Sequence, residues 1–251
     1  MPTAAFTEID GMLRVSAHGA HALFTGRAGG VSAAPYDTLN LGPWTGDDAE
    51  AIAENQRRIE ALVSTPEQAR RLVIGRQVHE SSVASHVAGF ADVEVDGVDA
   101  HVTDRPDLAL AVLTADCVPV ALLAPWGVGI AHAGWRGLAG GVVGGTIGEL
   151  LALGPDGSGD PAKISAFIGP CAGGCCYEVG EEVHAAFAGW PGHDPGARTV
   201  DLAALAAAAI EHEGVGEIVT AERCTIHEAG WFSHRASGGT TGRQAGVVWR
   251  G

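Results

Sequence analysis

Hydrophobic positions along the chain fall into short runs that predict buried strands separated by helical segments. Alternation of apolar and polar residues over Met12 to Ala17 predicts a strand, and the apolar runs Leu108 to Leu113 and Val118 to Ala131 predict buried strands. The turn Pro125-Trp126-Gly127 divides the second run, so Gly127 to His132 continues as a strand of its own. The same pattern predicts further strands over 22–25, 72–79, 82–88, 98–103, 163–168, 217–220 and 245–249.

Apolar residues at helical spacing predict four helices between these strands. Asp47 has the character of an N-cap with Glu50 three positions later, and a helix is expected from Asp48 to Val63. Leu138 to Leu151 follows one helical face, although each of its interior glycines costs about 1 kcal/mol relative to alanine. The other two helices are predicted over 179–188 and over 201–213, where Asp201 is the N-cap and Gly214 the stop.

Strands and helices alternate without a regular repeat, which predicts one mixed α/β domain over residues 1–251. A segment rich in Gly, Pro and Asn, residues 26–46, is too long for a simple turn, and loops of that length are often functional. It contains Arg27 and Asn40, which are turn or packing residues by default.

Composition and charge narrow the classes of function. Hydrophobic residues make up 46% of the chain and charged residues 18%, as in ordinary globular proteins. The net charge of -15, with the single lysine Lys163, argues against nucleic acid and anionic membranes as partners, and an anionic ligand would need a local arginine pocket. Residues 1–11 do not resemble a secretory signal, and no apolar run reaches the ~18 residues of a membrane span, so a cytoplasmic protein is expected.

The five cysteines form an odd, irregularly spaced set that favours a reducing compartment. Cys171, Cys175 and Cys176 are expected to be structural, because their spacing is not that of a zinc hairpin and no nearby histidine has ligand spacing. Cys224 is expected to be a small buried hydrophobe.

Reactive side chains stand near the ends of the two long apolar runs. Thr114-Ala115-Asp116-Cys117 follows the first run, and His132 opens the segment His132-Ala133-Gly134-Trp135-Arg136-Gly137. With His79, Cys117 and His132 are candidate zinc ligands that leave a fourth position open. The same residues also suit a cysteine nucleophile, Cys117, activated by His132, and their spacing does not separate these alternatives.

Arg136 is a candidate anion ligand, because guanidinium binds phosphate in a bidentate manner and the start of the helix that follows would assist. An internal salt bridge is an equally good interpretation of this residue.

Seven segments, in order, resemble one known family, the laccase-domain or polyphenol-oxidase-like proteins represented by bacterial YfiH and YlmD and also described as purine nucleoside phosphorylases. The segments are FTGRAGGVS (24–32), LNLGPWTGDD (39–48), QVHE (77–80), LTADCVPVALLAP (113–125), HAGWRGLAGGVV (132–143), IGPCAGGCCYEVGEEV (168–183) and FSHRASGGTTGRQAGVVW (232–249). The sequence departs from the family pattern at Glu80, where glycine is common, and in the turn from Ala172 to Cys175.

The resemblance implies a layered α/β/β/α mixed β-sandwich and one zinc ion held by His79, Cys117 and His132, with copper as the alternative metal. It also implies phosphorolysis of adenosine, inosine, guanosine or methylthioadenosine, and deamination of adenosine as a second activity. Arg136, Arg27 and Asn40 are the candidate contacts for substrate or phosphate, and Asp116 is a candidate proton carrier that could equally hold structure.

Two other functions remain open at the level of sequence. The family's older name suggests copper-dependent oxidation of phenols, although laccase chemistry ordinarily uses several coppers and the chain has no His-x-His pair. A non-catalytic protein of cell-wall quality control, in which the metal fixes the structure, is the third reading. A monomer is expected, because no segment suggests self-association.

Overall fold

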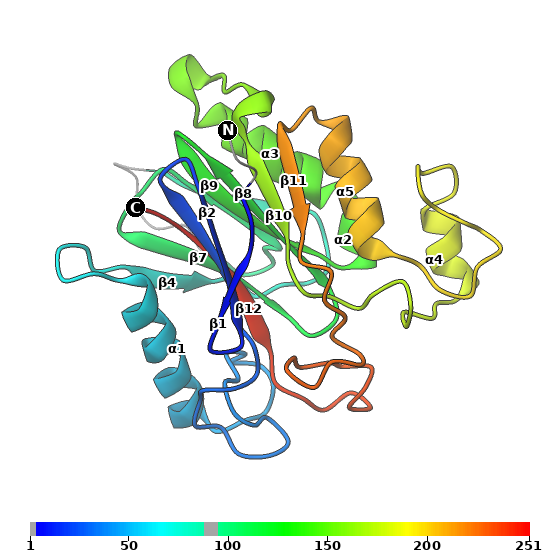
Figure 1. Cartoon of the computed structure of the whole chain (residues 1–251), viewed down its shortest axis with the longest axis horizontal. Coiled ribbons are helices and arrows are strands. Elements are labelled where there is room, and N and C mark those ends of the chain that lie inside the picture. Colours follow the sequence, from blue (N-terminus) through cyan, green and yellow to red (C-terminus); the bar gives the residue numbers. More distant parts are fainter. Residues whose placement is uncertain (1–3, 88–94) are drawn as a thin grey trace.

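Two six-stranded mixed sheets pack face to face in this computed structural model, which describes residues 4–87 and 95–251 (Figure 1). In order across the first sheet lie β1 (Thr7–Ile9), β2 (Met12–Ala17), β3 (Ala20–Phe24), β12 (Gln244–Arg250), β7 (Leu108–Thr114) and β4 (Arg71–Ile74). In order across the second sheet lie β11 (Glu217–Thr220), β10 (Ser165–Ile168), β8 (Val118–Ala124), β9 (Gly127–Ala133), β6 (Ala100–Thr103) and β5 (Val83–His86).

Helices cover the outer faces of both sheets. α1 (Ala49–Val63) lies on the first sheet, and α2 (Trp135–Ala139), α3 (Val142–Ala152) and α5 (Leu202–His212) lie on the second (Figure 1). The short helix α4 (Glu181–Ala186) and the 3-10 turns Pro155–Gly157 and Pro161–Lys163 complete the helical elements of the described residues. The expected layered α/β/β/α mixed sandwich is therefore confirmed.

The long apolar runs are central strands that are covered on both faces. In β7, Leu108 and Leu110 face the core between the sheets, whereas Ala109 and Ala111 face the layer that contains α1. β8 alternates in the same way between the inter-sheet core and the helices on the second sheet. Two-sided burial explains why these strands have no polar face.

Several boundaries differ from the predicted ones for local reasons. The N-cap of α1 is Asp48, which accepts hydrogen bonds from the N–H groups of Glu50 and Ala51, and not Asp47. The helix predicted over Leu138 to Leu151 is broken into α2 and α3, because Gly141 adopts φ 87° between them. The strand predicted over 72–79 ends at Ile74, and the end of the strand predicted over 82–88, Ala88, lies outside the described residues.

The pairing register brings the motif-bearing loops to one end of the sandwich. Thr114, at the end of β7, pairs with Gln244 at the start of β12, and β4 ends beside β7 because the two are parallel. In the second sheet, the start of β8 pairs with the end of β9, while β10 and β11 end side by side. The loops that follow or precede these strand ends therefore meet above the same edge of the two sheets.

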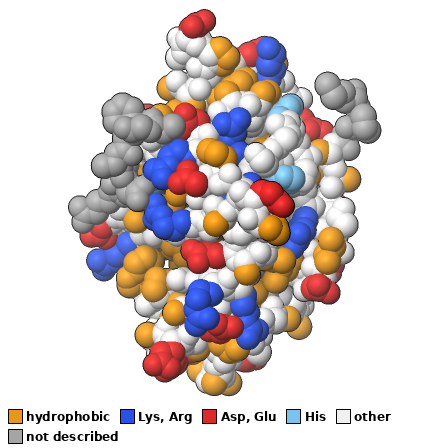
Figure 2. Space-filling view, turned by 90° about the vertical axis from the view of Figure 1, so that its left-hand side faces the viewer, with side chains coloured by type: hydrophobic (Ala, Val, Ile, Leu, Met, Phe, Trp, Pro, Cys, Tyr) orange, Lys and Arg blue, Asp and Glu red, His pale blue; other side chains and the backbone are white. Residues whose placement is uncertain are grey.

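The surface on the α1 side carries basic and acidic side chains that are interspersed (Figure 2). On α1 itself, Arg58 forms an ion pair with Glu54 at 2.9 Å, and Arg57 contacts the same carboxylate. Within the described part of the chain, none of the helices has the length and apolar character needed to cross a membrane.

Candidate functional site

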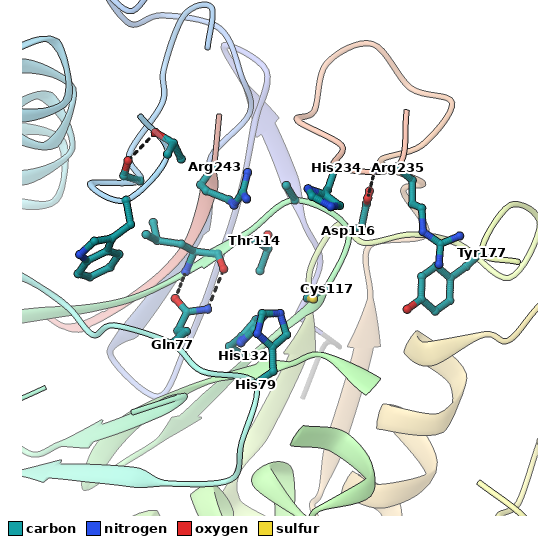
Figure 3. Close-up of a pocket in the computed structure, with 15 residues that line it drawn as sticks. Gln77, His79, Thr114, Asp116, Cys117, His132, Tyr177, His234, Arg235 and Arg243 are labelled. Carbon is teal, nitrogen blue, oxygen red and sulfur yellow. Dashed lines mark hydrogen bonds between the residues drawn. The ribbon is translucent and has the colours of Figure 1, made fainter. Parts of the chain in front are cut away.

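Two loops that cross from one sheet to the other, together with the end of β9, bring three soft ligands to one point. His79 lies between β4 and β5, Cys117 between β7 and β8, and His132 in β9. The ligand atoms of the three side chains all lie within 4.8 Å of one another, and the two imidazole rings are 4.8 Å apart in an edge-on arrangement. Figure 3 shows the three side chains gathered on one side of a cavity.

Asp99, the residue before β6, organises this cluster from beneath. Its fully buried carboxylate accepts hydrogen bonds from the backbone N–H groups of Val78, His79 and Glu80 at 2.9–3.0 Å. It also accepts the Nδ1 proton of His132 at 2.7 Å, which leaves the Nε2 of that ring for the cluster. These bonds hold His79 in a left-handed conformation, φ 63°, that a non-glycine residue rarely adopts.

Asp116 forms the turn that delivers Cys117, and its backbone has φ 102°. One carboxylate oxygen accepts a hydrogen bond from the Thr225 hydroxyl at 2.7 Å, and the other accepts one from the Arg235 N–H at 2.8 Å. The Asp116 carbonyl also accepts from the N–H of Ala172. Asp116 thus joins the Cys117 turn to two other loops, and its role as a proton carrier stays a prediction.

The electrostatics of the cluster favour a thiolate at Cys117. Burial acts to raise the pKa of the thiol, but the positive charge and hydrogen bond of His132, with a hydrogen bond from His79, lower that pKa to about 6. For His132, burial acts to lower the pKa of the imidazole, but the Cys117 thiolate and the Asp99 carboxylate raise that pKa to about 9. For Asp99, burial is outweighed by the hydrogen bonds from His132 and the backbone, which lower its pKa. The metal-free cluster is therefore a thiolate–imidazolium pair near neutral pH.

Gly134 has no side chain, and this absence leaves room for the side chains of the cluster. A Cβ atom at this position would come within 3.0 Å of His79 Cδ2 and 3.2 Å of Cys117 Sγ. The glycine of the HAGWRG segment is thus required by close packing against two of the three candidate ligands.

One thiolate and two imidazoles fit a zinc ion, because zinc takes nitrogen and sulfur ligands and a site with three protein ligands retains an open position. The carboxylate of Asp99 on the far nitrogen of His132 is the partner that metal-bound histidines usually have. The donor set therefore fits the metal expected from the sequence, and the three residues named from the sequence do converge.

The cluster forms one wall of a cavity of about 360 Å³. Gln77 fixes the loop before His79, because its amide exchanges two hydrogen bonds with the backbone of Leu113 at 2.7 and 2.8 Å. Thr114 also lines the cavity, although its hydroxyl oxygen is buried beneath the surface and has no hydrogen-bond partner among the described residues. The remaining walls include six side chains of use to a ligand: Trp44, Thr114, Tyr177, His234, Arg235 and Arg243.

Two arginines that sequence reasoning missed face this cavity. Arg243 is partly buried and donates to the carbonyls of Thr241 and Gly242, while Arg235 lies over the ring of Tyr177 at 4.8 Å (Figure 3). Burial lowers the pKa of Arg243, which still lies far above neutrality for a guanidinium. Both belong to the segment 232–249 that resembles the family, so the signal was present but had no assigned role.

The predicted substrate contacts lie elsewhere, since the described residues that line the cavity do not include Arg27, Asn40 or Arg136. Arg27 pairs with Asp37 at 3.1 Å and lies over the ring of Phe232. Arg136 is exposed and stacks on Trp135 at 4.2 Å. Asn40 is buried and helps to position Arg243, because its side-chain oxygen accepts a hydrogen bond from the backbone N–H of Arg243 at 2.8 Å.

Comparison with known proteins places the whole architecture in one family. A family model described as multi-copper polyphenol oxidoreductase laccase matches residues 21–251. Purine nucleoside phosphorylase ORF3 of Streptomyces griseus is 42% identical over 238 residues, which are 92% of this chain and 94% of that protein. Purine nucleoside phosphorylase YlmD of Geobacillus stearothermophilus is 35% identical over 280 residues, covering 100% of this chain and 98% of that protein.

Solved structures agree with these sequence relatives. YfiH of Bacillus licheniformis superposes with a TM-score of 0.86 at 30% identity, and YlmD of Geobacillus stearothermophilus with a TM-score of 0.84 at 34% identity. In each case the match covers 98% of this chain and 99% of the other. The resemblance drawn from the motifs is thus confirmed, and the chain belongs to the laccase-like family of YfiH and YlmD.

Proposed function

We propose that this protein is a zinc-dependent purine nucleoside phosphorylase that also deaminates adenosine. The observation that carries the proposal is a single cavity with soft metal ligands on one wall and two guanidinium groups on the others. Relatives that are 35–42% identical over nearly their whole length bear the name purine nucleoside phosphorylase, which supports the same assignment.

Phosphate is assigned to Arg243 and Arg235. The net charge of -15 would repel an anion from most of the surface, so a phosphate site must be built from local cations. These two arginines are the ones that line the cavity within the described residues, whereas Arg136 stacks on Trp135 outside it. Guanidinium groups bind phosphate through paired N–H donors, which also fixes the orientation of the nucleophile.

The nucleoside is assigned to the rest of the cavity. Trp44 lines it with 56% of its surface exposed, which leaves a ring face available to a purine. Tyr177 and His234 also line the cavity and offer polar side-chain atoms to the sugar or the base.

In phosphorolysis, a phosphate oxygen bonds to C1′ of the ribose as the bond from C1′ to the purine nitrogen breaks. The electron pair of that bond goes to the purine, which leaves as the base after taking up a proton, and ribose 1-phosphate is the second product. Arg243 and Arg235 hold the phosphate in place, and holding two reactants in line contributes a large part of such rate enhancements.

In deamination, water adds to the purine carbon that bears the amino group, and ammonia leaves to give inosine. A zinc ion bound by His79, Cys117 and His132 would supply a Lewis acid that lowers the pKa of a coordinated water. Asp99 keeps His132 in the tautomer that presents Nε2, and its backbone bonds keep His79 in position.

The test uses the full-length zinc-loaded protein with adenosine, with and without phosphate. Adenine and ribose 1-phosphate should form only when phosphate is present, and inosine should form in both cases. Arg243→Gln should slow phosphorolysis at sub-saturating phosphate and keep the deamination, while Arg136→Gln serves as the matched control that retains both. No product from any purine nucleoside with zinc bound would refute the proposal.

Oxidation of phenols by copper is the second candidate, because the family model carries a multi-copper oxidoreductase description. Against it, the cavity cluster contains three candidate ligands among the described residues, one of them a thiolate. Laccase chemistry ordinarily requires several copper ions. Phenol turnover after reconstitution of the metal-free protein with stoichiometric copper, and its absence with zinc, would establish this activity instead.

A further inference from the structure

A second group of metal-ligand side chains lies outside the cavity. Cys175 and Cys176, in the loop after β10, meet Cys224 and His227, in the loop after β11, and their four ligand atoms all lie within 4.8 Å of one another. The Sγ atoms of Cys175 and Cys176 are 3.3 Å apart, and His227 Nδ1 lies 3.7 and 3.2 Å from them.

The structure adds to the sequence expectation for these residues. Cys224 is buried as expected, and it also lies beside Cys175, Cys176 and a histidine, His227, that is distant from them in sequence. The parallel pairing of β10 with β11 places Ile168 beside Thr220, and an isolated bridge then joins Cys171 to Cys224. Residues about fifty positions apart therefore become neighbours, which spacing along the chain could not reveal.

The local backbone around Cys224 has the character of a metal-binding turn. Cys224-Thr225-Ile226-His227 places two ligands, the Cys224 sulfur and a ring nitrogen of His227, three positions apart in the chain. The Gly173 N–H donates to the same sulfur at 3.3 Å from the other loop. Such N–H donors stabilise a thiolate, the form in which cysteine binds metals.

We propose that Cys175, Cys176, Cys224 and His227 bind a second zinc ion in a closed, structural Cys₃His site. Zinc bonds of about 2.3 Å to sulfur and about 2.0 Å to nitrogen place tetrahedral S···S pairs about 3.8 Å apart and S···N pairs about 3.5 Å apart. The separations of 3.2–3.7 Å among Cys175, Cys176 and His227 are close to these values, and the Cys224 sulfur lies within 4.8 Å of all three ligand atoms. Four protein ligands fill the coordination sphere, unlike the three at the cavity.

The surroundings provide a route for a cation to reach the cluster. A second cavity, of about 480 Å³, is lined by Cys175, Cys224 and His227 together with the carboxylates Glu222 and Glu228. Arg223, which pairs with Glu228 at 3.6 Å, also lines this cavity. The cavity gives a cation a path to the cluster, and an entry path is one requirement of a real metal site.

The site would fasten one wall of the active-site cavity. The loop after β10 also carries Tyr177, and the loop after β11 carries Thr225 and Arg235, both of which donate to Asp116. A metal ion that joins these loops would thereby fix the position of residues that line the cavity. The metal ion itself would not touch the substrate.

The test is the metal content of the full-length protein purified in zinc and freed of loose metal by gel filtration. Wild type should hold two zinc ions per chain. Cys117→Ser and the double variant Cys175→Ser/Cys176→Ser should each hold one, and the combination of all three changes should hold none. Cys171→Ala is the matched control, since Cys171 is a buried neighbour outside the cluster, and it should hold two.

A measurement on the unaltered protein guards against variants that fail to fold. Cobalt titrated into metal-free wild type should saturate at two equivalents, with one of them giving the strong sulfur-to-metal absorption of a site with three thiolates. Saturation at one equivalent that is lost in Cys117→Ser would overturn the proposal. A disulfide between Cys175 and Cys176 in the freshly purified protein would do the same, because those sulfurs could not then be ligands.

Discussion

Replacing the buried carboxylate beneath the cluster, in Asp99→Asn, is the sharpest test of how the site is built. The two residues have nearly the same shape, so the change leaves packing intact and alters only charge and hydrogen bonding. Oδ1 of Asp99 accepts from His79 N–H and His132 Nδ1, and Oδ2 accepts from Val78 N–H and Glu80 N–H. Each oxygen therefore faces two donors.

An asparagine must direct its NH₂ group at one of these pairs of donors, whichever way its amide is turned. Turned toward Val78 and Glu80, the NH₂ group costs two hydrogen bonds to a charged acceptor. Turned toward His79 and His132, it costs at least the bond from the His79 N–H, because a neutral His132 can accept at Nδ1 only by placing its proton on Nε2, the nitrogen that faces the cluster. At about 1.5–3 kcal/mol for each bond, the free energy of unfolding falls by about 1.5–6 kcal/mol. Whole domains are stable by about 5–15 kcal/mol, so this loss is large. Metal affinity should fall by about 10–100-fold, because the partner that orients His132 is weakened.

Urea unfolding of the metal-free protein measures the first quantity, and competition with a chromogenic zinc chelator measures the second. Asp96→Asn is the matched control, since Asp96 forms only an exposed ion pair with Arg76 at 3.7 Å and should change stability by less than about 1 kcal/mol. If Asp99→Asn were as stable as this control and bound zinc equally tightly, the assignment of Asp99 as the organiser of the site would be wrong.

Four further outcomes follow from the same geometry. Arg243→Gln should raise KM for phosphate by about 10–100-fold in steady-state kinetics, with a smaller effect on KM for the nucleoside. Gly134→Ala should lower the free energy of unfolding in urea by about 1–3 kcal/mol, because its Cβ would lie 3.0 Å from His79 Cδ2. In the metal-free protein, the rate at which iodoacetamide alkylates Cys117 should be half-maximal near pH 6, because the thiol pKa is lowered to about 6. The same lowered pKa stabilises the folded protein at pH values above the ordinary pKa of a thiol, and this stabilisation is lost as the pH falls through about 6. Asp116→Asn should retain most of its phosphorolysis, measured as adenine released from adenosine and phosphate, with folding checked by thermal unfolding.

Much of the fold follows from the sequence because its strands are long, apolar and bounded by turns. The strand Met12–Ala17 has the bounds that alternation predicts, and Asp201 caps α5 as expected. The break between α2 and α3 was missed because glycines in a helical pattern show a cost but not where a left-handed residue will stand. The early end of β4 was missed because Gly75 to His79 is bent by Asp99, twenty or more residues away.

The candidate site divides in the same way between local and long-range information. Cysteine and histidine at strand ends identified the metal ligands, since the chemistry of those side chains is specific. The arginines of the cavity could not be chosen by type alone, because fourteen arginines are available and only the register of β7 with β12 brings Arg243 to the cavity. Asn40 was predicted as a substrate contact, but its side chain instead accepts a hydrogen bond from the backbone of Arg243, and such a long-range contact cannot be predicted from residue type.

Asp99 and Asp116 are both buried carboxylates beside the metal cluster. Their hydrogen-bond partners nevertheless predict opposite effects of asparagine on stability, a loss at Asp99 and little change at Asp116. The partners of Asp116 are the Arg235 N–H, which can only donate, and the Thr225 hydroxyl, which can donate or accept. An asparagine satisfies both by accepting from Arg235 and donating to Thr225, so structure survives where Asp99→Asn would lose it. A large loss of phosphorolysis in folded, zinc-loaded Asp116→Asn would then have to be chemical, and it would make Asp116 the proton carrier. Retained activity would make Asp116 a positioning residue for the Cys117 turn, the role that its two occupied oxygens favour.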